Sequence, residues 1–312
     1  MASFSFILNL LEINGRLPVG LIDNHWLDKA NPEQVSKIKD ILNAFRVFSQ
    51  HGFFYEHRQI EEPSANGKSA LYQRVELPPD DWRYWVVNFE GYNTEISSLQ
   101  NAANLMKSEI DFGFQVLGDE FKGSFMWDHV SLFNFYSDPS RFAEQPTVVE
   151  AETLKEMGYI YNLIKTLDPR YESIGNSVIE YNEMKRIHER SNIKTIGYFS
   201  IIESLITHQP RLPESIDSIM HQINTKMPLL NKRFNSPINI SDYFGETSPE
   251  SIWKKLYSYR SLLAHGGKPD FEKDLRVLRD RGNVNKFLKE SLKELMLYAL
   301  SEAAFISDLK KC

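Results

Sequence analysis

The stretch SPESIWKKLYSYRSLLAHGGKPD, residues 248–270, specifies one helix and both of its ends. Ser248 is a preferred N-cap residue, and Pro249 suits the first helical position. Apolar residues recur at helical spacing along one stripe, at Ile252, Leu256, Tyr259 and Leu263. Such a stripe is typical of a helix that packs on a core. Gly266 and Gly267 predict the end of the helix, because glycine accepts a left-handed backbone without cost.

Two chemically active side chains belong to this helix. Arg260 lies at the border of the apolar stripe and His265 in the last turn. Residues five apart on an ideal helix are rotated by about 140°, so one motif alone does not align the two side chains. An Arg often lays its stem on apolar surface, and the helix dipole favours a His near the C-terminal end. A structural and a chemical role both fit, and we expect removal of either side chain to cost little stability.

Composition limits the class of protein. The 312 residues are 42% hydrophobic, 12% aromatic and 25% charged, as in ordinary globular proteins large enough for two domains. The single Cys312 leaves no internal disulfide and no cysteine-built zinc site. The apolar run FSFILNLL near the start is too short to span a membrane and lacks a basic leader. We expect a cytoplasmic protein with no membrane association, no bound metal and no cofactor.

The chain as a whole is acidic, but one region of it is basic. The net charge is −6, from 36 Lys and Arg against 42 Asp and Glu, which argues against binding nucleic acid by overall charge. Between residues 252 and 293, however, eleven basic residues face five acidic ones. This region predicts either a phosphate-attracting surface or an ordinary solvated helical face. Candidate RNA-binding residues within it are Lys254, Lys255 and Lys268.

The first half of the chain predicts an α+β domain over residues 1–150. The segments FSFIL, LYQRVEL and RYWVVNF are rich in aromatic and β-branched residues and predict strands. The segment NPEQVSKIKDILNAFRVFSQHG predicts a helix with Asn31 as N-cap and Pro32 in the first turn. We interpret these 150 residues as a recognition or regulatory domain.

The second half, residues 151–312, predicts an all-α helical bundle. The Pro-bearing stretch SDPSRFAEQPTVV precedes it, and strand signals nearly vanish after it. Helical periods indicate helices at about 151–167, 171–190, 194–208, 214–230, 249–265 and 284–309.

The spacing of Arg260 and His265 occurs a second time in the chain. The segment RVFSQHG places Arg46 five residues before His51, again followed by Gly. Spacing alone therefore does not select a site. The all-α context favours Arg260 and His265, and we assign Arg46 and His51 to the end of an N-terminal helix.

Two segments of the helical half carry a family resemblance. IIESLITHQP on one helix and YRSLLAHGG at the end of a later one resemble the HEPN superfamily, particularly its Apea-like branch. The resemblance covers only the C-terminal half. It implies a helical bundle that dimerises, and in active members a metal-independent endoribonuclease with Arg260 and His265 as catalytic residues. Glu203 is implied as a supporting residue, and Ser261, directly after Arg260, is a further candidate for a supporting role.

The chain departs from the family pattern at two positions. Many active members have Asn, Asp or His directly after the Arg, where this chain has Ser261. Toxin members controlled by a nucleotidyltransferase often have Tyr two positions after the His, where this chain has Gly267. The second departure argues against that mode of control.

The residue chemistry fits RNA cleavage. A His that titrates near neutrality can move protons to and from a 2′-hydroxyl or a leaving 5′-oxygen, and an Arg can stabilise charge on the phosphate. Attack by the 2′-hydroxyl leaves a 2′,3′-cyclic phosphate and a 5′-hydroxyl. We expect an RNA-cleaving homodimer acting as a defence or toxin-like effector, the effector role resting on family analogy.

Two other interpretations remain open. The helical half is alternatively a non-catalytic, dimeric module that binds nucleotide or RNA, with Arg260 and His265 in structural roles. A third possibility is an unrelated enzyme within residues 1–150, although that half contains no recognised catalytic motif.

Overall fold

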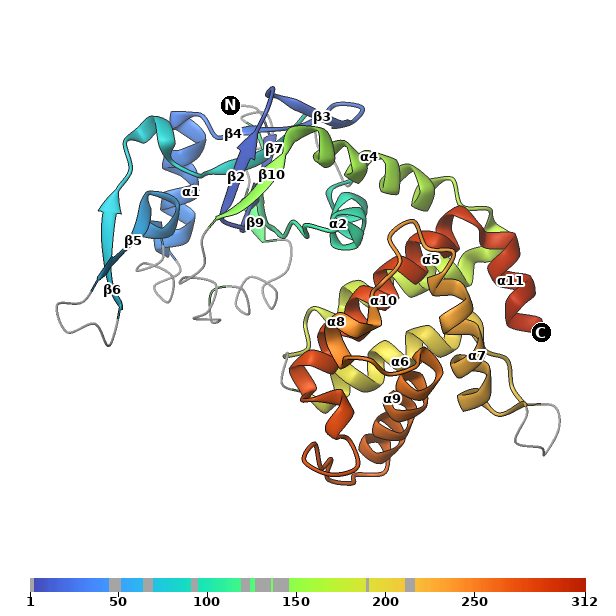
Figure 1. The fold of residues 1–312 in the computed structure, drawn as a ribbon. Coiled ribbons are helices and arrows are strands. Elements are labelled where there is room, and N and C mark those ends of the chain that lie inside the picture. The colour runs from blue at the N-terminus through green and yellow to red at the C-terminus, as the bar shows by residue number, and fades with distance from the viewer. Residues whose placement is uncertain are drawn as a thin grey trace. The chain divides into compact units, whose positions relative to one another are not determined.

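A computed structural model of the chain describes residues 3–44, 52–63, 70–90, 95–118, 124–126, 136, 146–188, 191–210 and 217–312. The chain divides into two compact units, Met1–Tyr161 and Asn162–Cys312. The first unit is α+β and the second is helical, as the sequence predicts at this level (Figure 1).

A six-stranded antiparallel sheet forms the centre of the N-terminal unit. Its strands, in spatial order, are β3 (Val19–Ile22), β4 (His25–Lys29), β7 (Trp85–Phe89), β1 (Ser3–Ile7), β8 (Phe112–Val116) and β9 (Ser124–Met126). Strand β1 is internal, with Ser5 opposite Val87 on one side and Gln115 on the other. The predicted strands FSFIL and RYWVVNF correspond to β1 and β7, and every residue of both strands is buried.

Helix α1 (Pro32–Ala44) has a capped first turn and packs on this sheet. The Gln34 backbone N–H donates to the Asn31 side chain at 2.9 Å, and the Asn31 backbone N–H donates to the Gln34 side chain at 3.0 Å. This reciprocal cap confirms the prediction of Asn31 as N-cap. Buried Ile38 and Leu42 join Phe6 and Phe114 in one core cluster. The predicted helix extends to residue 52, and residues 45–51 of it lie outside the described residues.

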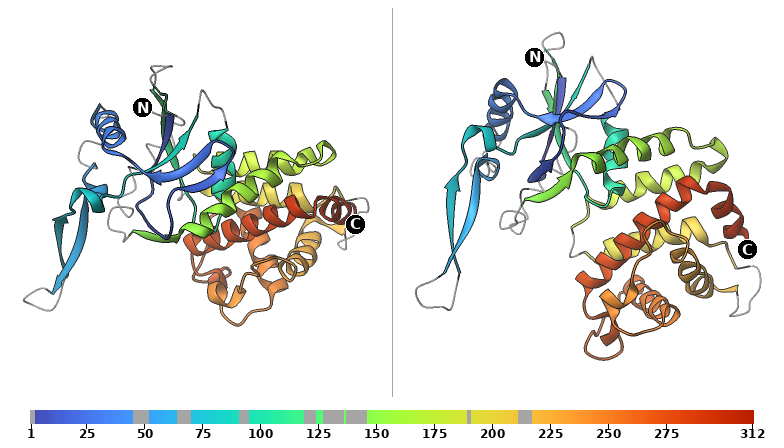
Figure 2. Two further views of the ribbon diagram at one scale, coloured as in Figure 1. Left: turned by 90° about the horizontal axis from the view of Figure 1, so that it is seen from above. Right: turned by 45° about the horizontal axis from the view of Figure 1, so that its top comes forward.

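Four further strands form two small sheets. Strand β2 (Leu11–Asn14) pairs in parallel with β10 (Thr147–Glu150). Strands β5 (His57–Pro63) and β6 (Ala70–Glu76) pair antiparallel, with Ile60 opposite Gln73, and extend away from the rest of their unit as a two-stranded ribbon (Figures 1 and 2). The predicted strand LYQRVEL is β6. Helix α2 (Ile96–Leu105) belongs to this unit as well.

The division between the units falls inside helix α4 (Ala151–Lys165), whereas the sequence places the boundary after residue 150. Gly158 lies so close to the preceding β-region that an added Cβ would be 1.9 Å from the Leu21 carbonyl oxygen. The Tyr161 hydroxyl donates to Glu95 at 2.9 Å. Most of α4 therefore packs as part of the N-terminal unit. Helical periodicity predicts the helix but carries no information about the unit that it joins.

The helical unit contains α5 (Glu172–Met184), α6 (Asn192–Ile206), α7 (Ile219–Asn231), α8 (Ile240–Phe244), α9 (Pro249–Ala264), α10 (Arg281–Ser301) and α11 (Ala303–Lys311). Single 3-10 turns lie at Pro169–Tyr171 and Arg276–Leu278. Helix α6 contacts α5, α7, α9, α10 and α11, so it is the central helix of the unit. Its buried residues are mostly apolar, which explains this position.

Two details of the helical unit differ from the prediction. The single helix predicted over about 284–309 is two helices, because Glu302 adopts φ −123° and ψ 46° between α10 and α11. After the break α11 packs against α6, and its residue Ile306 is buried. The short helix α8 has no counterpart in the prediction. The other predicted helices correspond to α4, α5, α6, α7 and α9, with shifted ends.

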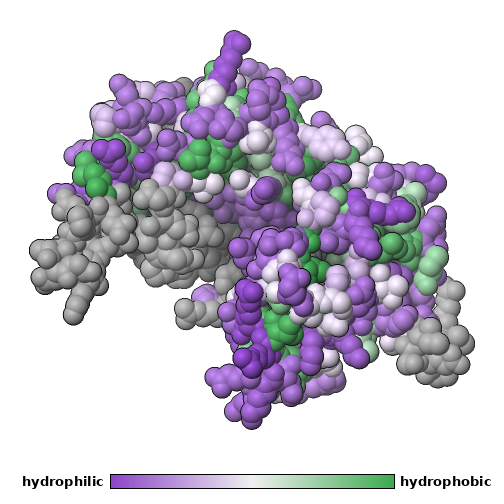
Figure 3. Space-filling view, viewed as in Figure 1, coloured by the Kyte–Doolittle hydropathy of each residue, from purple (hydrophilic) through white to green (hydrophobic). Residues whose placement is uncertain are grey.

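The face drawn in Figure 3 is largely polar. On the face drawn in Figure 3, hydrophilic residues predominate and hydrophobic ones form small separate areas. Across the described ranges, each helix is either too short or too polar to cross a membrane.

Candidate functional site

Helix α9 has the N-terminus and the apolar stripe that the sequence predicts. The Ser248 side chain accepts from the Ser251 backbone N–H at 3.3 Å, with Pro249 directly after the cap. The four stripe residues Ile252, Leu256, Tyr259 and Leu263 are all buried. Trp253, beside the stripe, is buried as well and packs on Phe287 of α10. This packing fixes the rotation of α9 and thus the direction of its remaining side chains.

The C-terminal end of α9 places His265 at the surface. The helix ends at Ala264, and His265 is the exposed C-cap residue. Gly266 has φ +72°, and the Gly267 N–H donates to the Leu262 carbonyl oxygen at 2.8 Å. A Cβ on Gly267 would lie 2.3 Å from the Leu262 side chain. The two glycines therefore allow the tight turn that exposes His265.

Arg260 is joined to α6 by an ion pair. One of its terminal nitrogens donates to Glu203 Oε2 at 3.1 Å. The side chains are 25% and 16% exposed, so the pair is partly shielded from water and stronger than an open surface pair. Burial raises the pKa of Glu203, and Arg260 acts in the opposite direction. The structure thus brings together Arg260 and the predicted supporting residue Glu203.

This ion pair leaves hydrogen-bonding capacity unused. Arg260 Nε and Glu203 Oε1 are both buried and have no hydrogen-bond partner among the described residues. A buried polar atom without a partner costs free energy and marks a place where water, an ion or a ligand group can gain a hydrogen bond. The pair is therefore a polar cluster with one free donor and one free acceptor.

Tyr257 belongs to the same cluster, and sequence reasoning missed it. Its ring centre lies 5.7 Å from the Arg260 guanidinium carbon, and the ring packs edge-on against Phe199 of α6. Burial raises the pKa of the Tyr257 hydroxyl, the Glu203 charge adds to the rise, and Arg260 opposes it. The sequence contains a usable signal, because residues three apart on a helix are neighbours.

The structure keeps Arg260 and His265 in different surroundings. Arg260 is partly buried against α6, and His265 lies at the exposed helix end. Within the part of the chain that the structure describes, no hydrogen bond or ion pair connects their side chains. Ser261, half-buried on the same turn, contributes its backbone oxygen to the His265 N–H at 3.1 Å.

The three candidate RNA-binding lysines are all exposed. On an ideal helix Lys254 lies opposite the apolar stripe of α9, Lys255 is rotated from the stripe by only about 70°, and Lys268 follows the terminal glycines. Lys255 Nζ donates to the Asp274 carbonyl oxygen at 3.0 Å, which links α9 to the following loop. Lys255 thus also has a structural contact.

The second Arg and His pair, Arg46 and His51, lies outside the described residues. The described residues also include no group of three or more His, Cys, Asp or Glu side chains arranged to hold a metal ion.

Comparisons of the chain with protein-family models, curated proteins and solved structures find no match. The resemblance to the HEPN superfamily therefore rests on residues of this chain alone.

Proposed function

We propose that the helical unit is a metal-independent endoribonuclease of HEPN type, with Arg260 and His265 as its catalytic residues. The observation that carries the proposal is the Glu203–Arg260 pair. It holds the partly exposed guanidinium of Arg260 where α9 packs against α6. The same helix ends in an exposed His. A held cation and an accessible proton carrier are two groups that cleavage of a phosphodiester requires.

The proposed chemistry divides the work between the two side chains. His265 takes the proton from the 2′-hydroxyl of RNA or gives one to the leaving 5′-oxygen. Arg260 stabilises negative charge that builds on the phosphate oxygens. The hydroxyl attacks phosphorus, the bond to the 5′-oxygen breaks, and the products are a 2′,3′-cyclic phosphate and a 5′-hydroxyl. DNA lacks the attacking hydroxyl and is expected to resist.

The proposed active form is a homodimer. One helix directs Arg260 and His265 about 140° apart, so a second copy beside the first supplies the missing group more readily than one chain does. Exposed Lys254, Lys255 and Lys268 are proposed to hold the RNA backbone. A cytoplasmic defence or toxin-like role is the biological setting that the family resemblance implies.

One observation favours a second candidate function. Arg260 is already neutralised by Glu203 and ties α6 to α9, which suits a structural residue in a non-catalytic dimeric module that binds nucleotide or RNA. In that case the ion pair stays closed and His265 serves only as a helix cap.

Incubation of the purified protein with total RNA and with matched single-stranded DNA, both in EDTA, separates these functions. The ribonuclease proposal predicts discrete RNA fragments and intact DNA. His265→Ala, prepared in parallel, should lose cleavage, whereas His221→Ala should keep it. His221 is an exposed His on α7 and controls for a contaminating nuclease. RNA binding without cleavage would favour the binding module, and hydrolysis only with added metal would favour an enzyme elsewhere in the chain.

A further inference from the structure

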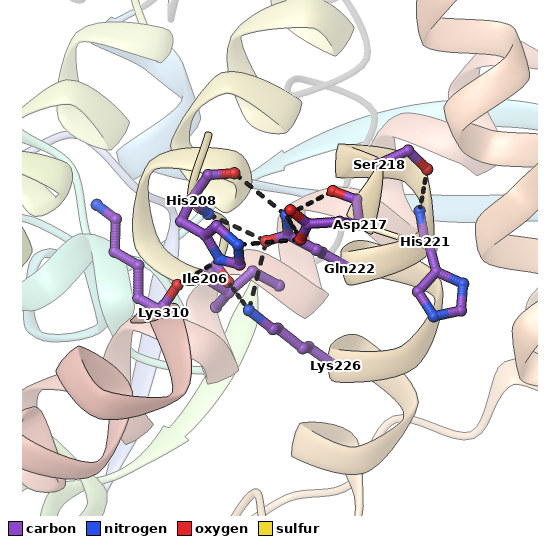
Figure 4. A network of polar contacts seen from close by, with 8 residues as sticks. All are labelled: Ile206, His208, Asp217, Ser218, His221, Gln222, Lys226 and Lys310. Carbon is purple, nitrogen blue, oxygen red and sulfur yellow. Dashed lines mark hydrogen bonds and ion pairs between the residues drawn. The ribbon is translucent and has the colours of Figure 1, made fainter. Parts of the chain in front are cut away.

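The C-terminal end of α6 is covered by ammonium groups from two other helices. Lys226 Nζ of α7 donates to the Ile206 carbonyl oxygen at 2.9 Å. Lys310 Nζ of α11 donates to the Ser204 carbonyl oxygen at 2.5 Å. Positive charge at a helix C-terminus satisfies free carbonyl groups and opposes the helix dipole. Helices α7 and α11 are therefore both attached to the end of the central helix, and Figure 4 draws the Lys226 contact.

His208, two residues beyond α6, connects the same two helices through its ring. Its Nε2 lies 3.0 Å from Asp217 Oδ1, just before α7, and its Nδ1 lies 3.0 Å from the Lys310 carbonyl oxygen on α11. Gln222 fixes the His208 backbone from both sides, accepting from its N–H at 3.0 Å and donating to its carbonyl at 3.2 Å. The ring is thus held between two oxygen atoms, as Figure 4 shows.

Both ring partners of His208 are acceptors in the observed contacts. A carbonyl oxygen has no proton to give, and a carboxylate only accepts. A neutral imidazole donates from one nitrogen and presents a lone pair at the other, so it leaves one lone pair facing an oxygen at 3.0 Å. Only the doubly protonated ring donates to both oxygens.

We propose that His208 is a pH-sensitive latch that fastens α11 to the end of α6 when the ring is protonated and releases it when the ring is neutral. The contact to Lys310 is the one lost on deprotonation. A carboxylate is the stronger acceptor, so the single remaining N–H stays on Asp217. This inference is independent of the ribonuclease proposal.

Charges of both signs lie around the ring, and a negative charge favours its protonated form whereas positive charges oppose it. Asp217 offers one negative charge directly to the ring. Lys226 and Lys310 point their ammonium groups at carbonyl oxygens of α6. Burial lowers the pKa of the Lys226 amine, while Cys312 and Asp217 act in the opposite direction. The folded network therefore holds one more hydrogen bond when the ring carries both protons. That bond is present when both ring nitrogens carry a proton and is lost when one of the two protons leaves.

Amide hydrogen exchange of the full chain, measured by mass spectrometry between about pH 5.5 and pH 8, tests the latch. After correction for intrinsic exchange rates, protection of α11 should fall about tenfold as pH rises, the effect of losing one hydrogen bond to a charged group. Protection of α9 should stay nearly constant and serves as the internal reference.

Two matched variants separate His208 from other titrating groups. His208→Gln should show weak α11 protection at every pH, because its amide carries no proton that titrates. His221→Gln should retain the wild-type pH dependence, because the His221 ring points away from the network and the bond to Ser218 comes from the His221 backbone N–H (Figure 4).

The wild-type series decides the matter even if His208→Gln fails to fold. Protection of α11 that does not change with pH in the wild type would overturn the latch. The latch would also be overturned if a folded His208→Gln protein still showed protection of α11 that depends on pH.

Discussion

Glu203 of α6 and Arg260 of α9 form a partly buried ion pair, with 3.1 Å between Glu203 Oε2 and one guanidinium nitrogen of Arg260. The two residues are 57 positions apart in sequence, and their pair connects two helices. It also alters one expectation from the sequence, because Arg260 is more than a side chain resting on apolar surface. Its removal leaves a shielded carboxylate without a cation, so Arg260→Ala should cost more stability than its sequence position predicts.

This cost should depend on pH. Burial raises the pKa of Glu203 and Arg260 lowers it, so removal of Arg260 raises the folded-state pKa further. A carboxyl group whose folded pKa is raised loses stability as pH climbs from its unfolded value towards its folded value. Urea unfolding should therefore find a larger deficit for Arg260→Ala at about pH 7 than at about pH 4, by about 1 kcal/mol.

The double variant Arg260→Ala/Glu203→Gln supplies the control, because glutamine carries no charge to bury. Its deficit should be nearly equal at both pH values. An Arg260→Ala deficit that is the same at both pH values would mean that loss of Arg260 does not change the cost of burying the Glu203 charge.

The glycine turn after α9 should be sensitive to added side chains. Gly267→Ala brings a Cβ to 2.3 Å from the Leu262 side chain, and Gly266→Ala forces an alanine to φ +72°. Each should lower the free energy of unfolding by about 1 kcal/mol. Gly175→Ala in α5 is the matched control, with its nearest contact at an ordinary 3.5 Å. It should raise stability by about 0.5 kcal/mol, because alanine favours helix. Equal effects at all three positions would argue against the tight turn.

The dimer proposal predicts a molecular mass of twice 36.3 kDa in solution. Light scattering at micromolar concentration, combined with cleavage assays on the same sample, measures it. A protein that is monomeric and fully active would contradict the proposal that two copies complete the site.

The sequence predicts those features of the fold that are determined locally. Helix α9 is of this kind, because Ser248, Pro249 and the two glycines specify its ends and its own stripe specifies its buried face. The break at Glu302 is not determined locally, because it depends on the packing of α11 against α6. The unit boundary inside α4 is missed for the same reason, since the contact of Gly158 with Leu21 is tertiary.

The candidate site likewise has features that the local sequence signals and features that depend on tertiary packing. Arg260 and His265 stand out by residue type and spacing, and Glu203 enters only through family resemblance. The pairing of Glu203 with Arg260 depends on the packing of α6 against α9, which no local pattern encodes. Tyr257 lacks a chemical signature of its own and becomes relevant only once Arg260 is known to lie over its ring.

The most direct test of the ribonuclease proposal is the cleavage rate of one labelled RNA in EDTA, with identification of the new ends. Wild-type protein should produce 2′,3′-cyclic phosphate and 5′-hydroxyl ends. His265→Ala and Arg260→Ala/Glu203→Gln should each be slower by about a hundredfold or more, with folding checked by melting temperature. The melting temperature of His265→Ala should barely change, because the side chain is exposed. Wild-type rates in both folded variants, or no RNA cleavage by the wild type, would contradict the proposal.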